Sequence, residues 1–287
     1  MKNKIIGVIG VWVLSVAGAW AQGGSDFTIP LSDPAKRGTL KAHLNYGSIT
    51  VKGTARKDVL VGYKQEKDDD DEDDKERERD RERDRDGYRK KSDNSSDGLR
   101  KISGGGMEIE ASENGNVVKV GSDSWNNKTS LIIEVPSNMD LKVSTYNDGD
   151  IVITNIQGEV ELTNYNGEIT ALNISGSVVA TTYNGEIKVT FDKVTEGTPM
   201  SYSTYNGDID LTFPANLKAT FKMKTDQGDI YTGFDMAVAS SGPVQKKDPK
   251  SGAFKLVVDE WKKGDVGGGG AEVTIRNYNG DIKIRKK

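Results

Sequence analysis

Glycine recurs every nine residues through the middle of the chain, and each glycine starts the same short pattern. The regular copies begin at Gly149, Gly158, Gly167, Gly176 and Gly185, and the unit returns at Gly207, Gly228 and Gly280. An acidic or small residue follows each glycine, and alternate residues after it are apolar, as in Gly167-Glu-Ile-Thr-Ala171. This alternation indicates a β-strand with one buried face. Nine residues hold one strand of about five residues and one tight turn.

Alternate copies of the unit differ in the two residues before the glycine. One class carries Tyr-Asn there, whereas the other carries Ile156-Gln157 or Ile174-Ser175. The Tyr-Asn class comprises Tyr146 (with Asp148 inserted before the glycine), Tyr165, Tyr183, Tyr205 and Tyr278. The true repeat is therefore a pair of nine-residue arms, 18 residues long, which lengthens to about 22 residues further on. Asn-Gly tolerates the positive φ of a tight reversal.

The repeat predicts an all-β fold. A single 18-residue unit cannot bury its apolar side, but stacked units can, which favours a β-helix-like β-solenoid with rungs of roughly 18–22 residues. The rival fold is an antiparallel β-barrel or sandwich of hairpins, because Asn-Gly between alternating strands also suits type I′ hairpin turns. The even nine-residue spacing and the recurrence of one residue type in every second arm favour the solenoid.

The ends and insertions of the chain divide it into four parts. Residues 1–21 are expected to be a signal peptide, because two lysines precede an apolar stretch and Ala19-Trp20-Ala21 forms a cleavage site. Residues 22–66 begin the β-repeat domain, and residues 67–98 form a charged insertion expected to be disordered. Residues 99–287 are expected to form the solenoid, with a loop insertion near 240–270. The mature protein is then extracytoplasmic, in the periplasm, secreted or at the cell surface.

Composition argues against several functional classes. The chain has no cysteine and a single histidine, His43, so zinc sites and triads with a histidine base are not expected. His43 is interpreted as an ordinary strand residue. A net charge of −4 does not favour nucleic acid as a partner. We expect no cofactor and no enzymatic activity, and no transmembrane segment in the mature chain.

Two columns of side chains follow from the repeat. The tyrosines Tyr146, Tyr165, Tyr183, Tyr205 and Tyr278 either form an exposed binding strip or pack at a corner and hold the rungs together. The acids after the glycines are candidate calcium ligands or turn caps: Asp150, Glu168, Glu186 and Asp208, with Asp229 and Asp281 in the same position. A polysaccharide-active enzyme that uses Glu168 and Glu186 is a further alternative, although equivalent acids in a column indicate repetition rather than a catalytic centre.

The repeats resemble the bacterial "putative adhesin" family of β-strand-repeat envelope proteins, whose function is unknown. The resemblance rests on the Gly-Asp/Glu-Ile unit, the Tyr-Asn-Gly turns and the opening Tyr46-Gly-Ser-Ile-Thr-Val-Lys-Gly53, and it extends from Gly38 to the C-terminus. The charged insertion departs from it. The resemblance implies a β-helix-like fold and an exported, non-enzymatic adhesin, scaffold or recognition module, with a glycan, an envelope protein or a second copy as partner.

Overall fold

The structure is a computed structural model that describes residues 25–66, 109–240, 243–247, 254–258 and 261–287. The predicted signal peptide and charged insertion lie outside this part. Every regular element within it is a β-strand. The first strands are β1 (Ser25–Pro30), β2 (Thr39–Thr54), β3 (Asp58–Gln65), β4 (Glu110–Asn114), β5 (Val117–Ser122), β6 (Thr129–Pro136), β7 (Asp140–Asn147), β8 (Ile151–Thr154), β9 (Glu159–Asn164) and β10 (Ile169–Thr181).

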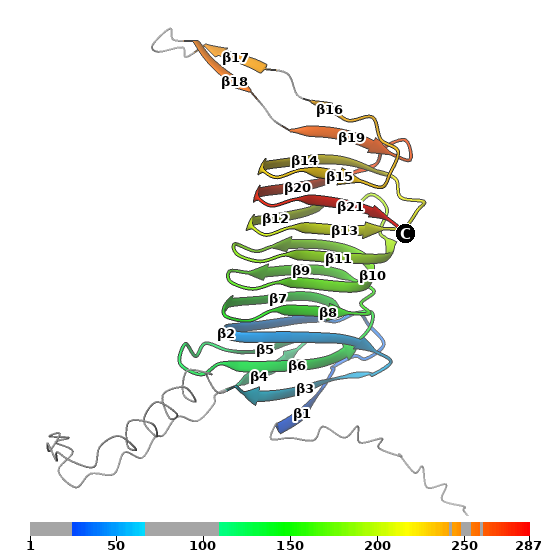
Figure 1. Cartoon of the computed structure of the whole chain (residues 1–287). Coiled ribbons are helices and arrows are strands. Elements are labelled where there is room, and N and C mark those ends of the chain that lie inside the picture. The colour runs from blue at the N-terminus through cyan, green and yellow to red at the C-terminus, as the bar shows by residue number, and fades with distance from the viewer. Residues whose placement is uncertain (1–24, 67–108, 241–242, 248–253, 259–260) are drawn as a thin grey trace, which may run out of the picture.

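The later strands continue the same pattern. They are β11 (Ile187–Val194), β12 (Met200–Asn206), β13 (Ile209–Phe213), β14 (Ala219–Gln227), β15 (Ile230–Thr232), β16 (Ala239–Ser240), β17 (Pro243–Lys247), β18 (Phe254–Val258), β19 (Lys262–Val266), β20 (Ala271–Asn279) and β21 (Ile282–Lys286). In the region of the predicted loop insertion, β17 and β18 pair as a hairpin that projects beyond the stack (Figure 1).

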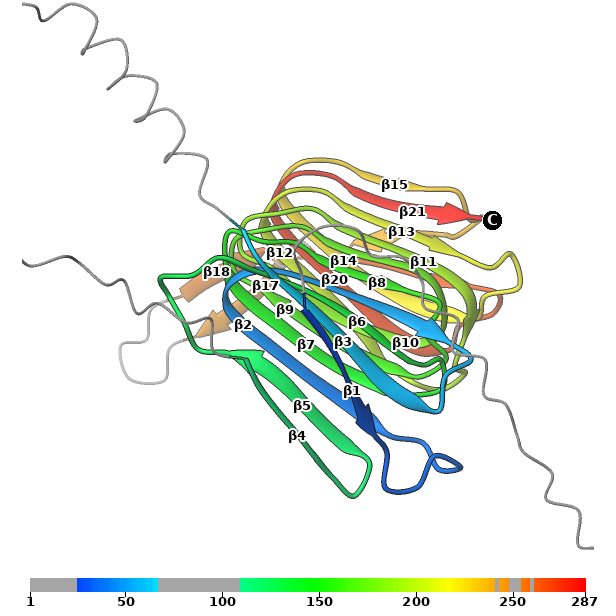
Figure 2. The ribbon, with the colours of Figure 1, turned by 90° about the horizontal axis from the view of Figure 1, so that it is seen from below.

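The strands form two long sheets that face each other, and the predicted β-solenoid is confirmed (Figures 1 and 2). Sheet 1 has the order β4-β5-β2-β7-β9-β10-β12-β20-β14-β19-β16. Sheet 2 has the order β1-β3-β6-β2-β8-β10-β11-β13-β21-β15. Each rung crosses sheet 1, turns at the Tyr-Asn-Gly corner and returns through sheet 2. The strands of neighbouring rungs pair in parallel. Antiparallel strands close both sheets at one end and sheet 1 at the other, whereas sheet 2 ends there on the parallel strand β15.

The rungs are not stacked in chain order. The second strand, β2, lies between β5 and β7 in sheet 1 and between β6 and β8 in sheet 2. The C-terminal strands β20 and β21 lie between the rung of β12 and β13 and the rung of β14 and β15. In Figure 1 the blue strand β2 therefore sits among green strands, and red strands sit between yellow ones. Strand β2 and the C-terminal strands are thus interior rungs, whereas the first strand, β1, lies at the edge of sheet 2 beside β3.

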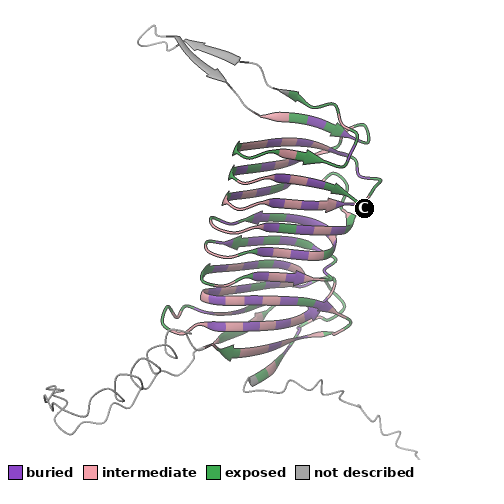
Figure 3. Cartoon of the chain, in the orientation of Figure 1, coloured by how far each residue is buried: buried purple, intermediate pink, exposed green. Residues whose placement is uncertain are grey.

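The core consists of matching columns of apolar side chains between the two sheets. Ile151, Ile169 and Ile187 pair in register in sheet 2, and all three are fully buried. At the other end of these strands, the rings of Phe191 in β11 and Phe213 in β13 stack with their centroids 5.0 Å apart. Buried residues alternate with exposed or half-buried ones along strands of the stack such as β7, β9 and β13 (Figure 3), so the apolar parity predicted to face inward does so there.

The corner glycines are required by close contact between rungs. Gly207 has a φ of 133°, which favours glycine, and a Cβ added there would collide with the backbone carbonyl of Gly185 in the next rung. Gly197 also has a positive φ, 78°, but no atom lies within 4 Å of a Cβ added there. These two positions separate the cost of the backbone conformation from the cost of the contact.

We predict that Gly207→Ala lowers the free energy of unfolding by about 3 kcal/mol or more, because it combines an unfavourable φ with a backbone collision. The matched variant Gly197→Ala is expected to cost only about 1 kcal/mol, since it carries the φ penalty alone. Urea denaturation followed by far-UV circular dichroism measures both. Equal costs for the two variants would show that the contact between rungs does not limit this position.

Candidate binding surface

The five tyrosines of the repeat form one continuous ladder at the corner between the sheets. Successive ring centroids lie 4.8, 5.0, 4.9 and 4.5 Å apart, and the interplanar angles are 2–7°. The order along the ladder is Tyr146, Tyr165, Tyr183, Tyr205 and Tyr278. The last step joins residues far apart in the chain, because β20 lies directly beside β12. The ring spacing is that of neighbouring β-strands, about 4.8 Å.

The ladder is exposed, and it presents ring edges rather than ring faces. Its members expose between 39% and 45% of their surface, so the tyrosines form an external strip. The same rings also join the rungs, because each covers the faces of its neighbours. What reaches solvent is therefore a row of ring edges and hydroxyl groups. Partial desolvation, together with Tyr278 and Tyr183, raises the pKa of the Tyr205 hydroxyl, so this phenol is neutral at physiological pH.

Different residues close the two ends of the ladder. Trp125, from the loop before β6, packs edge-on against Tyr146 with the centroids 5.2 Å apart and the planes at 78°. The periodic pattern did not include this residue. In the rung beyond Tyr278, the register places Asp226 at the ladder position, where its carboxylate pairs with the ammonium of Lys224 at 3.1 Å. The aromatic strip thus has defined limits, a tryptophan at one end and an ion pair at the other.

A second ladder, of asparagine amides, runs beside the tyrosines. The Nδ2 of Asn184 donates to the Oδ1 of Asn166 at 2.8 Å, and the Nδ2 of Asn206 donates to Asn184 at 2.8 Å. Longer bonds of 3.3 and 3.4 Å add Asn147 and Asn279 to the two ends. The four bonds join residues that are 19, 18, 22 and 73 positions apart in the chain. The amide bonds fix the register of the corners that carry the tyrosines.

The residue before each tyrosine points inward and bonds to the neighbouring rung. Thr204 Oγ1 donates to the carbonyl of Gly185 at 3.0 Å, and Asn277 Nδ2 donates to the carbonyl of Gly207 at 2.8 Å. Asn277 is fully buried, and its Oδ1 has no hydrogen-bond partner among the described residues. Threonine occupies the equivalent place in both adjacent rungs, at Thr204 and Thr225. Asparagine therefore supplies the needed donor but adds an unpaired acceptor.

We predict that Asn277→Thr leaves stability unchanged or raises it, because threonine keeps the bond to Gly207 and removes the unpaired oxygen. Asn277→Val has nearly the shape of threonine but lacks the hydroxyl, so it should be less stable than Asn277→Thr by about 1–3 kcal/mol. Thermal and urea unfolding of the two variants give this difference. If both variants unfold alike, the donor to Gly207 contributes nothing.

The acids that follow the glycines form a column on the outer surface of sheet 2. Asp150 Oδ1 accepts a bond from the backbone N–H of Glu168 at 2.8 Å, and Asp208 accepts one from Asp281 at 2.9 Å. Asp281 in turn accepts one from Asp229, also at 2.9 Å. The aspartates therefore cap the backbone of the next rung, as the turn-capping alternative predicted. Glu186 lies between Glu168 and Asp208 in the same column.

The described part of the chain brings no three His, Cys, Asp or Glu side chains together in a group that could hold a metal ion. Beside Asp150, the ammonium of Lys128 lies 2.9 Å from the carboxylate of Asp148 and 3.7 Å from that of Glu66. A positive charge from the protein itself thus lies among these acids. Lys283 plays a similar part further along the column, where its ammonium bonds to Asp208.

The hydrogen bonds from Lys283 and from the backbone of Asp281 lower the pKa of Asp208. A carboxyl group with a lowered pKa in the folded state stabilises the protein above about pH 4, and this contribution is lost as the pH falls through the lowered pKa. We predict that wild type is more stable than Asp208→Asn at pH 7 and that the difference shrinks below about pH 4. Urea titrations from pH 7 to pH 2 measure it. A difference that is independent of pH would contradict this account.

His43 lies on the outer surface of β2 and is half exposed. Its Nδ1 lies 2.8 Å from the hydroxyl of Ser144 in β7, and its Nε2 lies 2.9 Å from Oδ1 of Asn45. The carboxylate of Asp123 is 3.8 Å from Nε2. The sequence interpretation of His43 as an ordinary strand residue missed these contacts, because Ser144 is more than a hundred residues away and becomes its neighbour only through the insertion of β2.

Comparison with known proteins gives one family and one similar structure. A family model described as Toastrack DUF4097 matches residues 139–285. None of the curated proteins matches the chain. A crystal structure described as a "putative cell adhesion protein" from Clostridium sporogenes ATCC 15579 is similar, with a TM-score of 0.43 and 11% identity over 92% of this chain and 100% of that chain. Within the described residues, no helix is long and apolar enough to cross a membrane.

Proposed function

The chain belongs to the Toastrack DUF4097 family, and from its exposed tyrosine ladder we propose that it is an exported, non-enzymatic recognition module of the cell envelope. The family match supports the resemblance to β-strand-repeat proteins drawn from the sequence. The ladder is the observation that carries the proposal. Five large rings on one edge of a rigid fold form an aromatic surface of a kind that is enriched at interfaces.

The geometry of the ladder favours a particular kind of contact. The interior rings have both faces covered by other tyrosines, so they cannot stack on the flat face of a sugar ring or another aromatic. They offer ring edges and hydroxyls at the strand spacing. A partner would therefore lie across the strip and exchange hydrogen bonds with the hydroxyl row, as an envelope protein or a hydroxylated polymer can. The rings are already held by stacking, so little side-chain entropy is lost on binding.

Export is supported by the first 21 residues, whose basic start, apolar stretch and Ala19-Trp20-Ala21 site are those of a signal peptide. A mature protein in the periplasm or at the cell surface would meet envelope polymers and proteins directly. The absence of cysteine from the sequence means that the fold depends on packing and strand pairing rather than on disulfides in that compartment.

A non-enzymatic role is also supported by the surroundings of the groups that could do chemistry. Ser144 and His43 make the contact of a nucleophile with a base. However, β7 is paired on both sides in sheet 1, so the backbone amides beside Ser144 are used in the sheet and are not available to stabilise an oxyanion. The aspartates Asp150, Asp208 and Asp281 bond to the backbone of the next rung, and Asp208 also bonds to Lys283. A role in binding requires no reaction at the Ser144–His43 pair or at the acids of sheet 2.

The first test replaces two adjacent rings in the middle of the ladder. We expect Tyr183→Ser with Tyr205→Ser to weaken binding of the purified protein to isolated envelopes of the producing organism by about tenfold or more, since interface aromatics often contribute about 2 kcal/mol each. Sedimentation of the envelopes with labelled protein measures binding. The matched control is Tyr231→Ser, which removes a tyrosine that is 51% exposed on sheet 2, outside the ladder. Equal binding of the double variant and the control would refute the role of the ladder.

The rival enzymatic role has its own test. The purified protein is expected to release no reducing ends from envelope polysaccharides. If hydrolysis is detected, Glu168→Gln, Glu186→Gln and Ser144→Ala separate the acid column from the Ser-His pair. Hydrolysis abolished by any of these substitutions would overturn the proposal of a non-enzymatic module.

A further inference from the structure

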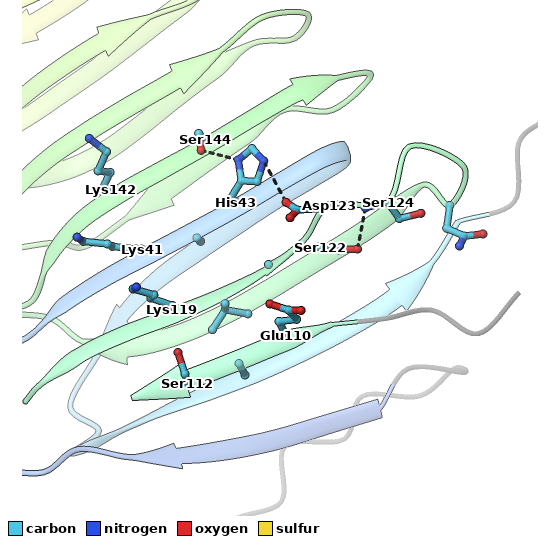
Figure 4. A pocket seen from close by; sticks show the side chains of 15 residues that line it. Lys41, His43, Glu110, Ser112, Lys119, Ser122, Asp123, Ser124, Lys142 and Ser144 are labelled. Atoms are coloured by element: carbon cyan, nitrogen blue, oxygen red, sulfur yellow. Dashed lines mark hydrogen bonds and ion pairs between the residues drawn. The ribbon is translucent and has the colours of Figure 1, made fainter. Parts of the chain in front are cut away.

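A second surface with different chemistry lies on the outer face of sheet 1, toward the N-terminal end of the stack. It is a hollow of about 940 Å³ formed by β4, β5, β2 and β7 (Figure 4). The hollow exists because Gly121 lacks a side chain in a row where Glu110 is its neighbour on one side and His43 on the other. A Cβ on Gly121 would collide with the backbone carbonyl of His43, so the floor of the hollow is fixed by the strand pairing.

One wall of the hollow is a column of three lysines. Lys41 in β2 pairs in register with Lys119 in β5 on one side and with Lys142 in β7 on the other. All three side chains are exposed and point outward from the same face (Figure 4). The strand spacing places them about 4.8 Å apart at the backbone. They come from three separate segments and meet only because β2 is inserted between β5 and β7.

The positive charge of this column is only partly compensated. Lys142 pairs with Glu161 at 2.8 Å. Within the described residues, neither Lys41 nor Lys119 lies within 4.0 Å of a carboxylate oxygen. Like charges on directly opposed strand positions destabilise a sheet. The arrangement therefore costs stability in the free protein, and an anionic ligand across the column would remove that cost.

The opposite wall carries acceptors and other polar groups. Glu110 and Asp123 border the hollow, together with the hydroxyl of Ser144 and the amide of Asn127. Ser112 instead extends the lysine row, because it pairs in register with Lys119. Carboxylates accept hydrogen bonds from hydroxyl groups but repel a ligand that is anionic along its whole surface. The two walls thus suit a ligand that bears acidic groups on one edge and hydroxyl donors on the other.

We propose that this hollow binds a linear acidic polysaccharide, with its carboxylates on Lys119, Lys41 and Lys142 and its hydroxyls toward Glu110, Asp123 and Ser144. A polymer lies along the stack, because the lysines repeat in that direction. Polyphosphate satisfies the lysines but brings no hydroxyl donors to the acids, and a neutral glycan brings no anionic partner to Lys41 and Lys119. No tyrosine of the ladder lines the hollow, so variants of Lys41 and Lys119 test this proposal independently of the ladder.

The experiment uses oligogalacturonate, a linear polymer of a uronic acid, and its methyl ester, which has the same sugar without the charge. Isothermal titration calorimetry of the purified protein is expected to detect binding of the acid form and none of the ester. Binding should weaken as salt is raised, since it depends on exposed charges. The double variant Lys41→Gln with Lys119→Gln should bind about tenfold more weakly or worse, because two charge-assisted hydrogen bonds are lost.

Matched controls separate this site from general charge effects and from the ladder. Lys188→Gln removes an exposed lysine from the outer face of sheet 2 and should bind oligogalacturonate as wild type does. Tyr183→Ser with Tyr205→Ser should also bind it normally, even where envelope binding is lost. Circular dichroism melting confirms that each variant is folded. Equal binding of acid and ester, polyphosphate binding tighter than the uronate, or equal losses in Lys188→Gln and the double variant would each overturn the proposal.

Discussion

The fixed distance between hydrogen-bonded strands is the constraint on which the rest of the structure depends. Parallel rungs lie about 4.8 Å apart, so every side chain meets its equivalent in the next rung at that distance. Tyrosine rings stack, asparagine amides bond in series and isoleucines pack in columns because the backbone carries all of them with one spacing. The corner glycines allow this approach, since even a methyl group at Gly207 would collide with the neighbouring carbonyl.

Features that depend on local pattern could be predicted from the sequence. The strands, the turns, the inward parity and the tyrosine column all follow from periods of two, nine and 18 residues. The order of the rungs could not be predicted, because β20 and β21 carry the same unit as the others and nothing local marks their place. Tyr278 follows Tyr205 in the ladder only because the C-terminal rung is inserted before the rung of β14 and β15. The order of the rungs is determined by long-range strand pairing and not by the periodicity of the sequence.

The candidate sites also combine features that the local pattern predicts with features that depend on long-range strand pairing. The sequence predicted the tyrosine column, but the exposure of ring edges rather than ring faces follows from stacking at the strand spacing. The hollow on sheet 1 could not be predicted from the sequence. Lys41, Lys119 and Lys142 lie outside the regularly spaced glycine units, and they become neighbours only through the position of β2. A stacked fold thus brings unlike segments into one column, and sites that break the repeat arise where a terminal segment is inserted.

The lysine column and the tyrosine ladder each depend on an inserted rung. Lys41 occupies the middle of the lysine column because β2 lies between β5 and β7, and Tyr278 extends the ladder because β20 lies beside β12. Each inserted rung is paired on both sides, so leaving the stack would break strand pairing with two neighbours rather than one. Stability in a linear solenoid is lost most easily from its ends. Here Lys41 and Tyr278 lie on strands that are paired on both sides, whereas the edge strands β1 and β4 carry no lysine of the column and no tyrosine of the ladder.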